Sequence, residues 1–150
     1  MTVTTATPPL QVTLSSASGK AGETVTVSLS QVSNPVRNTS TISLEFTYDT
    51  TKLAIPTYVN GSAIEANEWA GVDTTTTPGK VTVIIADLAS PTDSIFGLQN
   101  GELLRFTFPI KATAPTGTIP LPMTLPLALD RTGQGITSIV KTDGAITVTP

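Results

Sequence analysis

Residues 80–87 read KVTVIIAD, and this segment decides the fold class. Val81, Val83 and Ile85 occupy every second position, so one side of the segment is uniformly apolar. Alternation with a period of two is typical of a β-strand that rests one face on a core. Most of the side chains are β-branched, and such stiff side chains favour strands over helices. The segment therefore predicts a half-buried strand.

The same alternation recurs on both sides of this segment. Further alternating stretches, separated by Gly, Pro, Asn or Asp, are residues 10–14, 24–29, 41–48, 53–64, 69–77, 103–111 and 145–148. Three prolines interrupt residues 121–129, so only an edge strand or an irregular strand fits there. About nine short strands at regular spacing predict an all-β, two-sheet sandwich, with a jelly roll as one possible topology.

Length and composition fit one such domain. The chain has 150 residues, 39% of them hydrophobic and only 13% charged, with 12 Pro and 11 Gly to supply turns. A chain of this length can bury a core without disulfide bonds. We interpret residues 1–9, which are rich in Thr and Pro, as a linker remnant that starts with a cloning methionine. Residues 10–149 are then the folded module.

The residue types that most enzymes need are absent. The chain contains no histidine and no cysteine, which excludes Ser-His-Asp and Cys-His catalysis and the usual zinc sites. It also has no glycine-rich phosphate loop. Carboxylate pairs remain, namely Glu65 with Glu68 and Asp87 with Asp93, and we interpret them as solvated loop acids. The sequence predicts a protein that is not an enzyme and needs no cofactor.

Charge and hydropathy narrow the possible partners. The formal net charge is −3 and the isoelectric point is about 4.7, so no basic footprint for nucleic acid or anionic lipid exists. No stretch is apolar for long enough to insert into a membrane. Low charge and abundant Thr and Ser fit a secreted or cell-surface protein. Weak self-association remains open.

Two ligand classes need separate consideration. Asp87, Asp93 and the hydroxyls between them could offer oxygens to calcium, although EF-hand spacing is missing. A flat sugar-binding platform would have to use Trp69, Tyr58 and Phe96, because the other phenylalanines belong to apolar stripes. A carbohydrate-binding module of an extracellular polysaccharide-degrading protein is therefore an alternative to a protein-binding module. A passive immunoglobulin-like spacer is a third reading.

Five segments, in their order and spacing, resemble the cohesin module, the receptor half of the cohesin–dockerin pair that assembles cellulosomes. They are VTLSSASGKAGETVTVSL (12–29), ISLEFTYDTTKLAI (42–55), KVTVIIADLAS (80–90), GELLRFTFPIKATAPTGTIPL (101–121) and TDGAITV (142–148). The similarity extends over residues 10–149. It implies a nine-stranded jelly-roll β-sandwich that binds a dockerin-bearing protein and so assembles a scaffoldin or cell-surface complex for polysaccharide degradation. Any calcium is then expected on the dockerin, a small helical domain.

In cohesins, dockerin docks on the sheet that contains the family's strands 8, 3, 6 and 5. We take residues 101–111 as strand 8, which makes Ile84 and Leu103 the expected apolar centre of this face. The partner-binding residues implied by position are Thr41, Ser43, Glu45, Thr47, Thr82, Ile84, Ala86, Asp87, Leu88, Leu103, Arg105 and Thr107. Thr41 and Ser43 stand where cohesins often have Asn and Asp, so the class of dockerin stays open.

Overall fold

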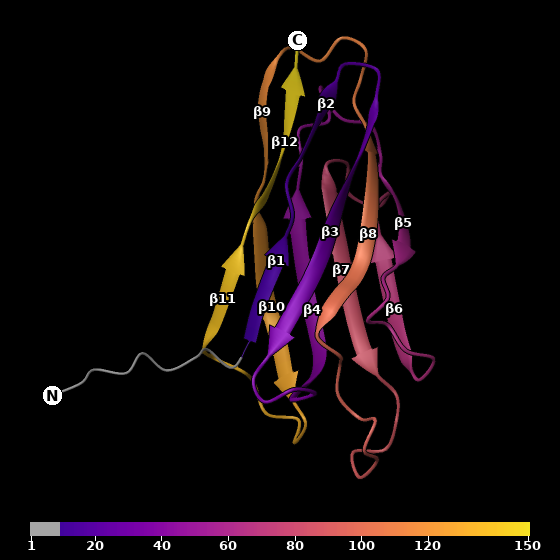
Figure 1. Cartoon of the computed structure of the whole chain (residues 1–150), viewed down its shortest axis with the longest axis vertical. Helices are drawn as coiled ribbons and strands as arrows, with labels where there is room; N and C mark the ends of the chain where they lie inside the picture. The colour runs from indigo at the N-terminus through magenta and orange to yellow at the C-terminus, as the bar shows by residue number, and fades with distance from the viewer. Residues whose placement is uncertain (1–9) are drawn as a thin grey trace, which may run out of the picture.

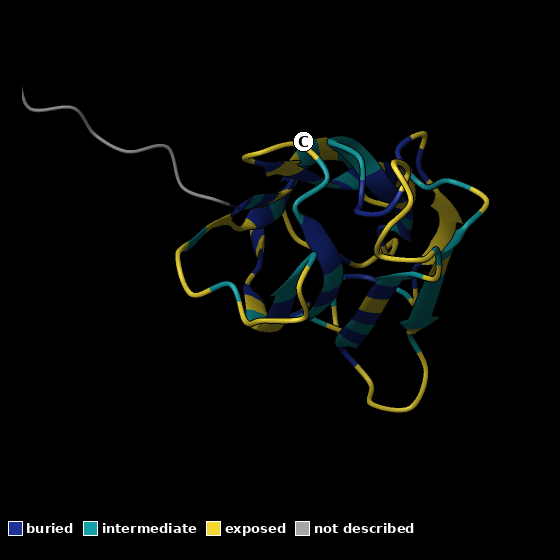
Figure 2. Cartoon of the chain, turned by 90° about the horizontal axis from the view of Figure 1, so that it is seen from below, coloured by how far each residue is buried: buried dark blue, intermediate teal, exposed yellow. Residues whose placement is uncertain are grey.

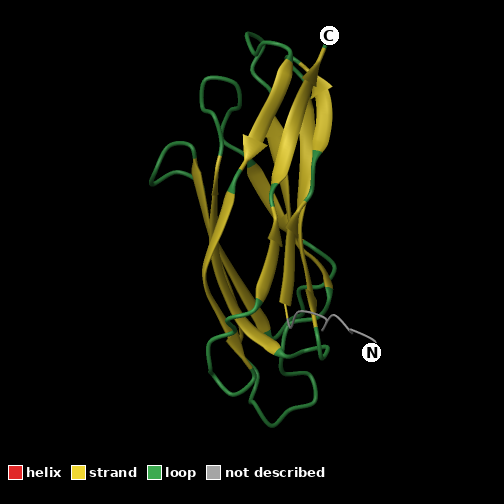
Figure 3. Cartoon of the chain, turned by 90° about the vertical axis from the view of Figure 1, so that its left-hand side faces the viewer, coloured by secondary structure: helices red, strands yellow, loops and turns green. Residues whose placement is uncertain are grey.

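The computed structural model describes residues 10–150, which consist of strands, turns and loops (Figure 3). The linker expected at residues 1–9 lies outside this part of the chain. The strands are β1 (Leu10–Leu14), β2 (Ala17–Lys20), β3 (Thr24–Ser33), β4 (Thr39–Thr47), β5 (Thr57–Asn60), β6 (Glu68–Asp73), β7 (Lys80–Asp87), β8 (Gly101–Pro109), β9 (Gly117–Leu121), β10 (Met123–Asp130), β11 (Ile139–Thr142) and β12 (Gly144–Thr149).

Two facing sheets form a jelly-roll sandwich, with a smaller sheet at its upper end (Figure 1). The first sheet has the strand order β11-β1-β3-β8-β5, and the second has the order β10-β4-β7-β6. The small sheet has the order β2-β12-β9. Within residues 10–150 no helix is long and apolar enough to span a membrane.

The expected count of nine strands is not confirmed, since the described residues form twelve. Part of the difference comes from two places where the chain passes from one sheet into another. Ser15 and Ser16 separate β1 from β2, which was not predicted as a strand, and β1 pairs with β11 while β2 pairs with β12, both in parallel. Asp143 separates β11 from β12 in the same way.

The core lies between the two sheets and consists of the apolar stripes that alternation predicts. Phe46 from β4 and Phe106 from β8 are fully buried, and their rings meet edge to face with centroids 5.2 Å apart. Phe108 is also fully buried, and its ring contacts that of Tyr48 in the same geometry. Seen from the lower end of the sandwich, buried and less buried residues alternate along several strands, and many of the loops are exposed (Figure 2).

Candidate functional site

The outward side of the four-stranded sheet, called the outer face below, is built from cross-strand rows of side chains. Antiparallel pairing places directly opposed residues on the same face of a sheet. Three consecutive rows, read from β10 through β4 and β7 to β6, are Leu129-Thr41-Ala86-Trp69, Leu127-Ser43-Ile84-Gly71 and Thr124-Glu45-Thr82-Asp73. The inward residues of β4 and β7, such as Leu44 and Val83, belong to the core.

Ile84 and Trp69 are the large apolar side chains on the β7 and β6 side of this face. Ile84 is 40% exposed and Trp69 is 51% exposed. Gly71 stands directly opposite Ile84, and a Cβ at Gly71 would lie only 2.5 Å from the Trp69 ring. The indole therefore folds along β6 over the space that glycine leaves, beside Ile84. Together these two residues form one continuous apolar area.

Leu127 extends this area onto β10. The pairing of β10 with β4 shifts register between Thr124 and Leu127, around Pro126, and it resumes with Leu127 opposite Ser43. Leu127 is exposed on the outer face. The small side chain of Ser43 separates it from Ile84, so a shallow apolar row crosses the sheet from edge to edge.

The residues of β4 and β7 that the sequence placed on one face do lie together on the outer face. Thr41, Ser43, Glu45 and Thr47 share the outer face with Thr82, Ile84 and Ala86, because their pairing partners match in register. Glu45 also forms an ion pair of 2.8 Å with Lys80 at the upper rim. The structure thus brings together seven of the predicted residues.

The expectation for residues 101–111 is wrong. β8 pairs with β3 and β5 in the five-stranded sheet, so Arg105 and Thr107 lie across the sandwich from Ile84. Leu103 is fully buried, because a register shift in the pairing of β8 with β3 turns both Leu103 and Leu104 toward the core. The strand that neighbours β4 in the four-stranded sheet is β10.

Asp87 does not belong to the outer face either. It lies opposite Glu68, one position out of phase with Ile84 and Ala86. Its Oδ1 accepts hydrogen bonds from Asn67 Nδ2 and from the backbone N–H of Ala89, both at 2.8 Å. Its Oδ2 accepts one from the backbone N–H of Gly97 at 2.7 Å. The carboxylate is thus occupied by the chain itself.

Leu88 is placed as expected. Its N–H donates to the Asn67 carbonyl at 2.8 Å, which prolongs the pairing of β7 with β6 by one residue. Leu88 therefore continues the outward positions of Ile84 and Ala86, and it is 71% exposed.

Sequence reasoning missed the contributions of β10 and β6. Prolines conceal the alternation of β10, so Leu127 and Leu129 give no clear period-2 signal. Trp69 was considered only as part of a sugar platform. Its position two residues before Gly71 is the one local signal that could have placed its ring flat on a strand.

Three of the four carboxylates considered for catalysis, Glu65, Glu68 and Asp87, form contacts within the chain. Glu65 forms an ion pair with Arg37 at 2.7 Å, and Glu68 Oε2 accepts a hydrogen bond from the Glu65 N–H. Both side chains are partly buried, so the expectation of solvated acids is wrong for this pair. Asp93 is exposed, but the oxygens of Asp87 point to backbone N–H groups. Among residues 10–150 no group of three acids, His or Cys could hold a metal ion.

Glu68 stands out electrostatically. Burial raises its pKa, the hydrogen bond from the Glu65 N–H opposes this rise, and the neighbouring charge of Asp87 adds to it. Its Oε1 is buried without a hydrogen-bond partner. Glu68 therefore holds its proton more tightly in the folded protein than in the unfolded chain. The protonated Glu68 contributes to stability in full below the ordinary Glu pKa of about 4.3. This contribution is lost as the pH rises through the raised pKa of the folded state.

We expect Glu68→Gln to become more stable relative to the wild type as the pH rises from about 4 to about 7. The neutral amide carries no charge to desolvate, while the other titrating groups are common to both proteins. Urea unfolding at several pH values measures the difference. Glu23→Gln, which alters an exposed acid, is the control. A constant difference, or one that shrinks with rising pH, would contradict the prediction.

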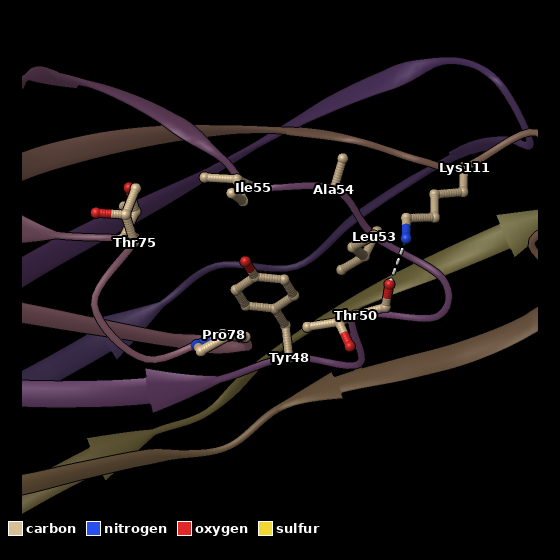
Figure 4. Close-up of a pocket in the computed structure, with 9 residues that line it drawn as sticks. Tyr48, Thr50, Leu53, Ala54, Ile55, Thr75, Pro78 and Lys111 are labelled. Carbon is tan, nitrogen blue, oxygen red and sulfur yellow. Dashed lines mark hydrogen bonds between the residues drawn. The ribbon is translucent and has the colours of Figure 1, made fainter.

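A cleft of about 440 Å³ is lined by residues that follow β4, β6 and β8 (Figure 4). The Tyr48 hydroxyl points into it, and Lys111 closes one end with a hydrogen bond to the Thr50 carbonyl at 2.6 Å. Its remaining lining residues are apolar or carry hydroxyls, namely Leu53, Ala54, Ile55, Thr74, Thr75 and Pro78. None is a carboxylate, so the cleft lacks the acid pair that glycoside hydrolysis requires.

The three aromatic residues of the sugar-binding alternative do not form a platform. Trp69 lies on β6 in the four-stranded sheet, and Tyr58 lies on β5 in the five-stranded sheet. Phe96 is buried beneath the guanidinium of Arg131, whose central carbon lies 5.4 Å from the ring centroid. The structure therefore favours the protein-binding reading.

Comparison with known proteins gives a consistent result. The family model described as "Cohesin domain" matches residues 10–148. A search of curated protein sequences finds no match. Among solved structures, the chain is similar to the sixth cohesin of scaffoldin B from Acetivibrio cellulolyticus, solved in complex with a Cel5 dockerin. That match has a TM-score of 0.80 and 21% identity, and covers 93% of this chain and 99% of that one.

Two further structures show the same fold at low sequence identity. The cohesin CaCohA2 from Clostridium acetobutylicum matches with a TM-score of 0.74 and 22% identity, over 95% of this chain and 92% of that one. A non-cellulosomal cohesin from the archaeon Archaeoglobus fulgidus matches with a TM-score of 0.74 and 17% identity, over 94% of this chain and 91% of that one.

Proposed function

The chain belongs to the cohesin family, whose members are protein-binding modules and not enzymes, and from this premise we propose that its outer face docks a dockerin domain. The observation that carries the proposal is the group of exposed apolar side chains Leu127, Ile84 and Trp69, which lie on three strands of the outer face among Thr, Ser and Glu side chains. An exposed apolar patch with a polar rim is typical of the centre of a protein interface.

The proposed docking surface consists of the outer face and Leu88. It keeps the expected residues Thr41, Ser43, Glu45, Thr47, Thr82, Ile84, Ala86 and Leu88, and it adds Trp69, Leu127 and Leu129. Leu103, Arg105, Thr107 and the carboxylate of Asp87 are left out. Ser43 and Thr41, where many cohesins carry an amide or an acid, leave apolar contact as the main source of affinity.

The calcium of the complex belongs to the dockerin in this proposal. The module itself then binds its partner without a cofactor, and removal of calcium acts on the partner's fold. We also propose that the module is part of a secreted or cell-surface assembly. Its low charge and its abundance of Thr and Ser support this location.

We expect the immobilised module to capture at least one member of a dockerin panel in calcium buffer and to lose it in the presence of a chelator. Calcium binding organises the dockerin, so its removal should abolish capture altogether. Retention on insoluble cellulose, measured in parallel, tests the sugar-binding alternative with Trp69→Ala as its probe. Calcium-independent retention on cellulose with no dockerin captured would overturn the proposal.

A further inference from the structure

The segment between β7 and β8, residues 88–100, is called the 88–100 loop below. It contains no strand and hangs from the lower end of the sandwich (Figure 1). It is fixed by side chains at the ends of two strands of the four-stranded sheet, the inner strand β7 and the edge strand β10. Asp87 lies at the end of β7, and Arg131 follows the last residue of β10. The loop therefore runs along the lower edge of the outer face.

Arg131 binds the tip of this loop. Its Nη1 donates to the Phe96 carbonyl, and its Nη2 reaches the carbonyls of Pro91 and Asp93, both at 3.3 Å. Its guanidinium also covers the ring of Phe96, a cation–π arrangement. Within residues 10–150 no carboxylate lies within ion-pair distance of Arg131, and the hydrogen bonds of its guanidinium all go to the loop.

Arg37 and Asp87 fix the base of the loop separately. Arg37 Nη1 donates to the carbonyls of Ile95 at 2.7 Å and of Gly97 at 3.0 Å. Gly97 has a φ of +101°, and a Cβ there would overlap the carbonyl oxygen of Arg37. Leu98 is fully buried and its N–H donates to the Thr39 carbonyl. The base therefore keeps its anchors when Arg131 is replaced.

The ordered loop exposes an apolar side chain. Ile95 is 45% exposed although its neighbour Phe96 is buried, and Leu88 marks the point where the loop leaves β7. Loops without regular structure are usually mobile, and ordering them on binding costs affinity. A loop that is already held by hydrogen bonds avoids this cost.

We propose that Arg131 is a positioning residue for partner binding, which holds the 88–100 loop so that Ile95 forms a second contact area beside the outer face. The inference rests on the proposed function, and its occupant is the same dockerin domain. Arg131 acts through the loop and does not itself need to touch the partner.

A double-mutant cycle on dockerin affinity tests the inference. We expect Arg131→Ala to weaken binding about 10-fold and Ile95→Ala to weaken it about 5-fold. We expect Ile95→Ala to cost less affinity in the Arg131→Ala background than in the wild type, because Ile95 is then held only through the hydrogen bond between its carbonyl and Arg37. Arg131→Lys, which keeps the charge and one donor group, should recover part of the affinity. Lys141→Ala, which removes a positive charge on β11, is the control.

Hydrogen exchange in the free protein reports on the loop independently of the partner. We expect Arg131→Ala to speed exchange of the Asp93 and Phe96 amides, which bond within the loop, and to leave the Val83 amide in β7 protected. Additive affinity losses, or wild-type affinity for Arg131→Ala, would overturn the inference while the binding of the wild type still supports the proposed function. Failure of the wild type to bind any dockerin would remove both.

Discussion

Ile84→Asp is expected to weaken dockerin binding by at least about 100-fold, while the melting temperature stays close to that of the wild type. Ile84 lies at the centre of the outer face, with Gly71 and the Trp69 ring on one side and Ser43 on the other. A carboxylate at this position would lose its hydration when the partner docks. No cation of the outer face lies beside it to compensate for this loss. Isothermal titration against a captured dockerin measures the affinity.

A matched control separates docking from folding in this experiment. Thr26→Asp places the same side chain at an exposed position of β3, on the outward side of the other sheet. Both variants carry the same cost of aspartate in a strand, so their melting temperatures should shift by similar small amounts. Only Ile84→Asp should lose the partner. Equal affinity of the two variants would remove the outer face as the docking surface.

Phe106→Ala is expected to lower the free energy of unfolding by about 3–5 kcal/mol. The ring is fully buried and contacts Phe46 edge to face at 5.2 Å, and it also lies 6.5 Å from the Tyr58 ring. Its loss leaves a cavity between the two sheets that rigid strands cannot close. Urea unfolding of Phe106→Ala measures the loss.

The neighbouring residue supplies the control for this variant. Thr107 lies on the same strand and points outward, so Thr107→Ala should change stability by no more than about 0.5 kcal/mol. A loss below about 1 kcal/mol for Phe106→Ala would mean that the sandwich core tolerates the cavity, contrary to its packing.

Local alternation predicted most of the long strands and most of the side chains that enter the core, but it did not predict β2, β9 and β11. Val83 and Phe46 each sit at the centre of an uninterrupted period-2 run, and the two faces of such a run differ so strongly in polarity that only one can be buried. For the same reason the outward positions of β4 and β7 were predictable, Ile84 among them.

Strand neighbours and irregularities could not be read from the same pattern. Which strand pairs with β4 is decided by the path of the chain across the sandwich, so residues 101–111 and Met123–Asp130 could not be ranked from alternation alone. Leu103 is buried because of one register shift in the pairing of β8 with β3. One extra residue in a strand reverses which face the side chains on its far side point to, and alternation alone does not reveal it. Asp87 was misplaced although alternation puts it in phase with the inward Ile85, and its hydrogen bond from Gly97, ten residues away in an irregular loop, could not be predicted.

The proline in β10 also limits how copies of this module can associate. β10 is an outermost strand, and a free strand edge is a template on which another chain can extend the sheet. Pro126 has no N–H to offer, and the ladder of β10 is already discontinuous beside it. A bound chain would find no regular backbone ladder there. The β10 edge is thus protected from pairing with a second copy of the module, and recognition at this sheet is left to side chains on its outer face.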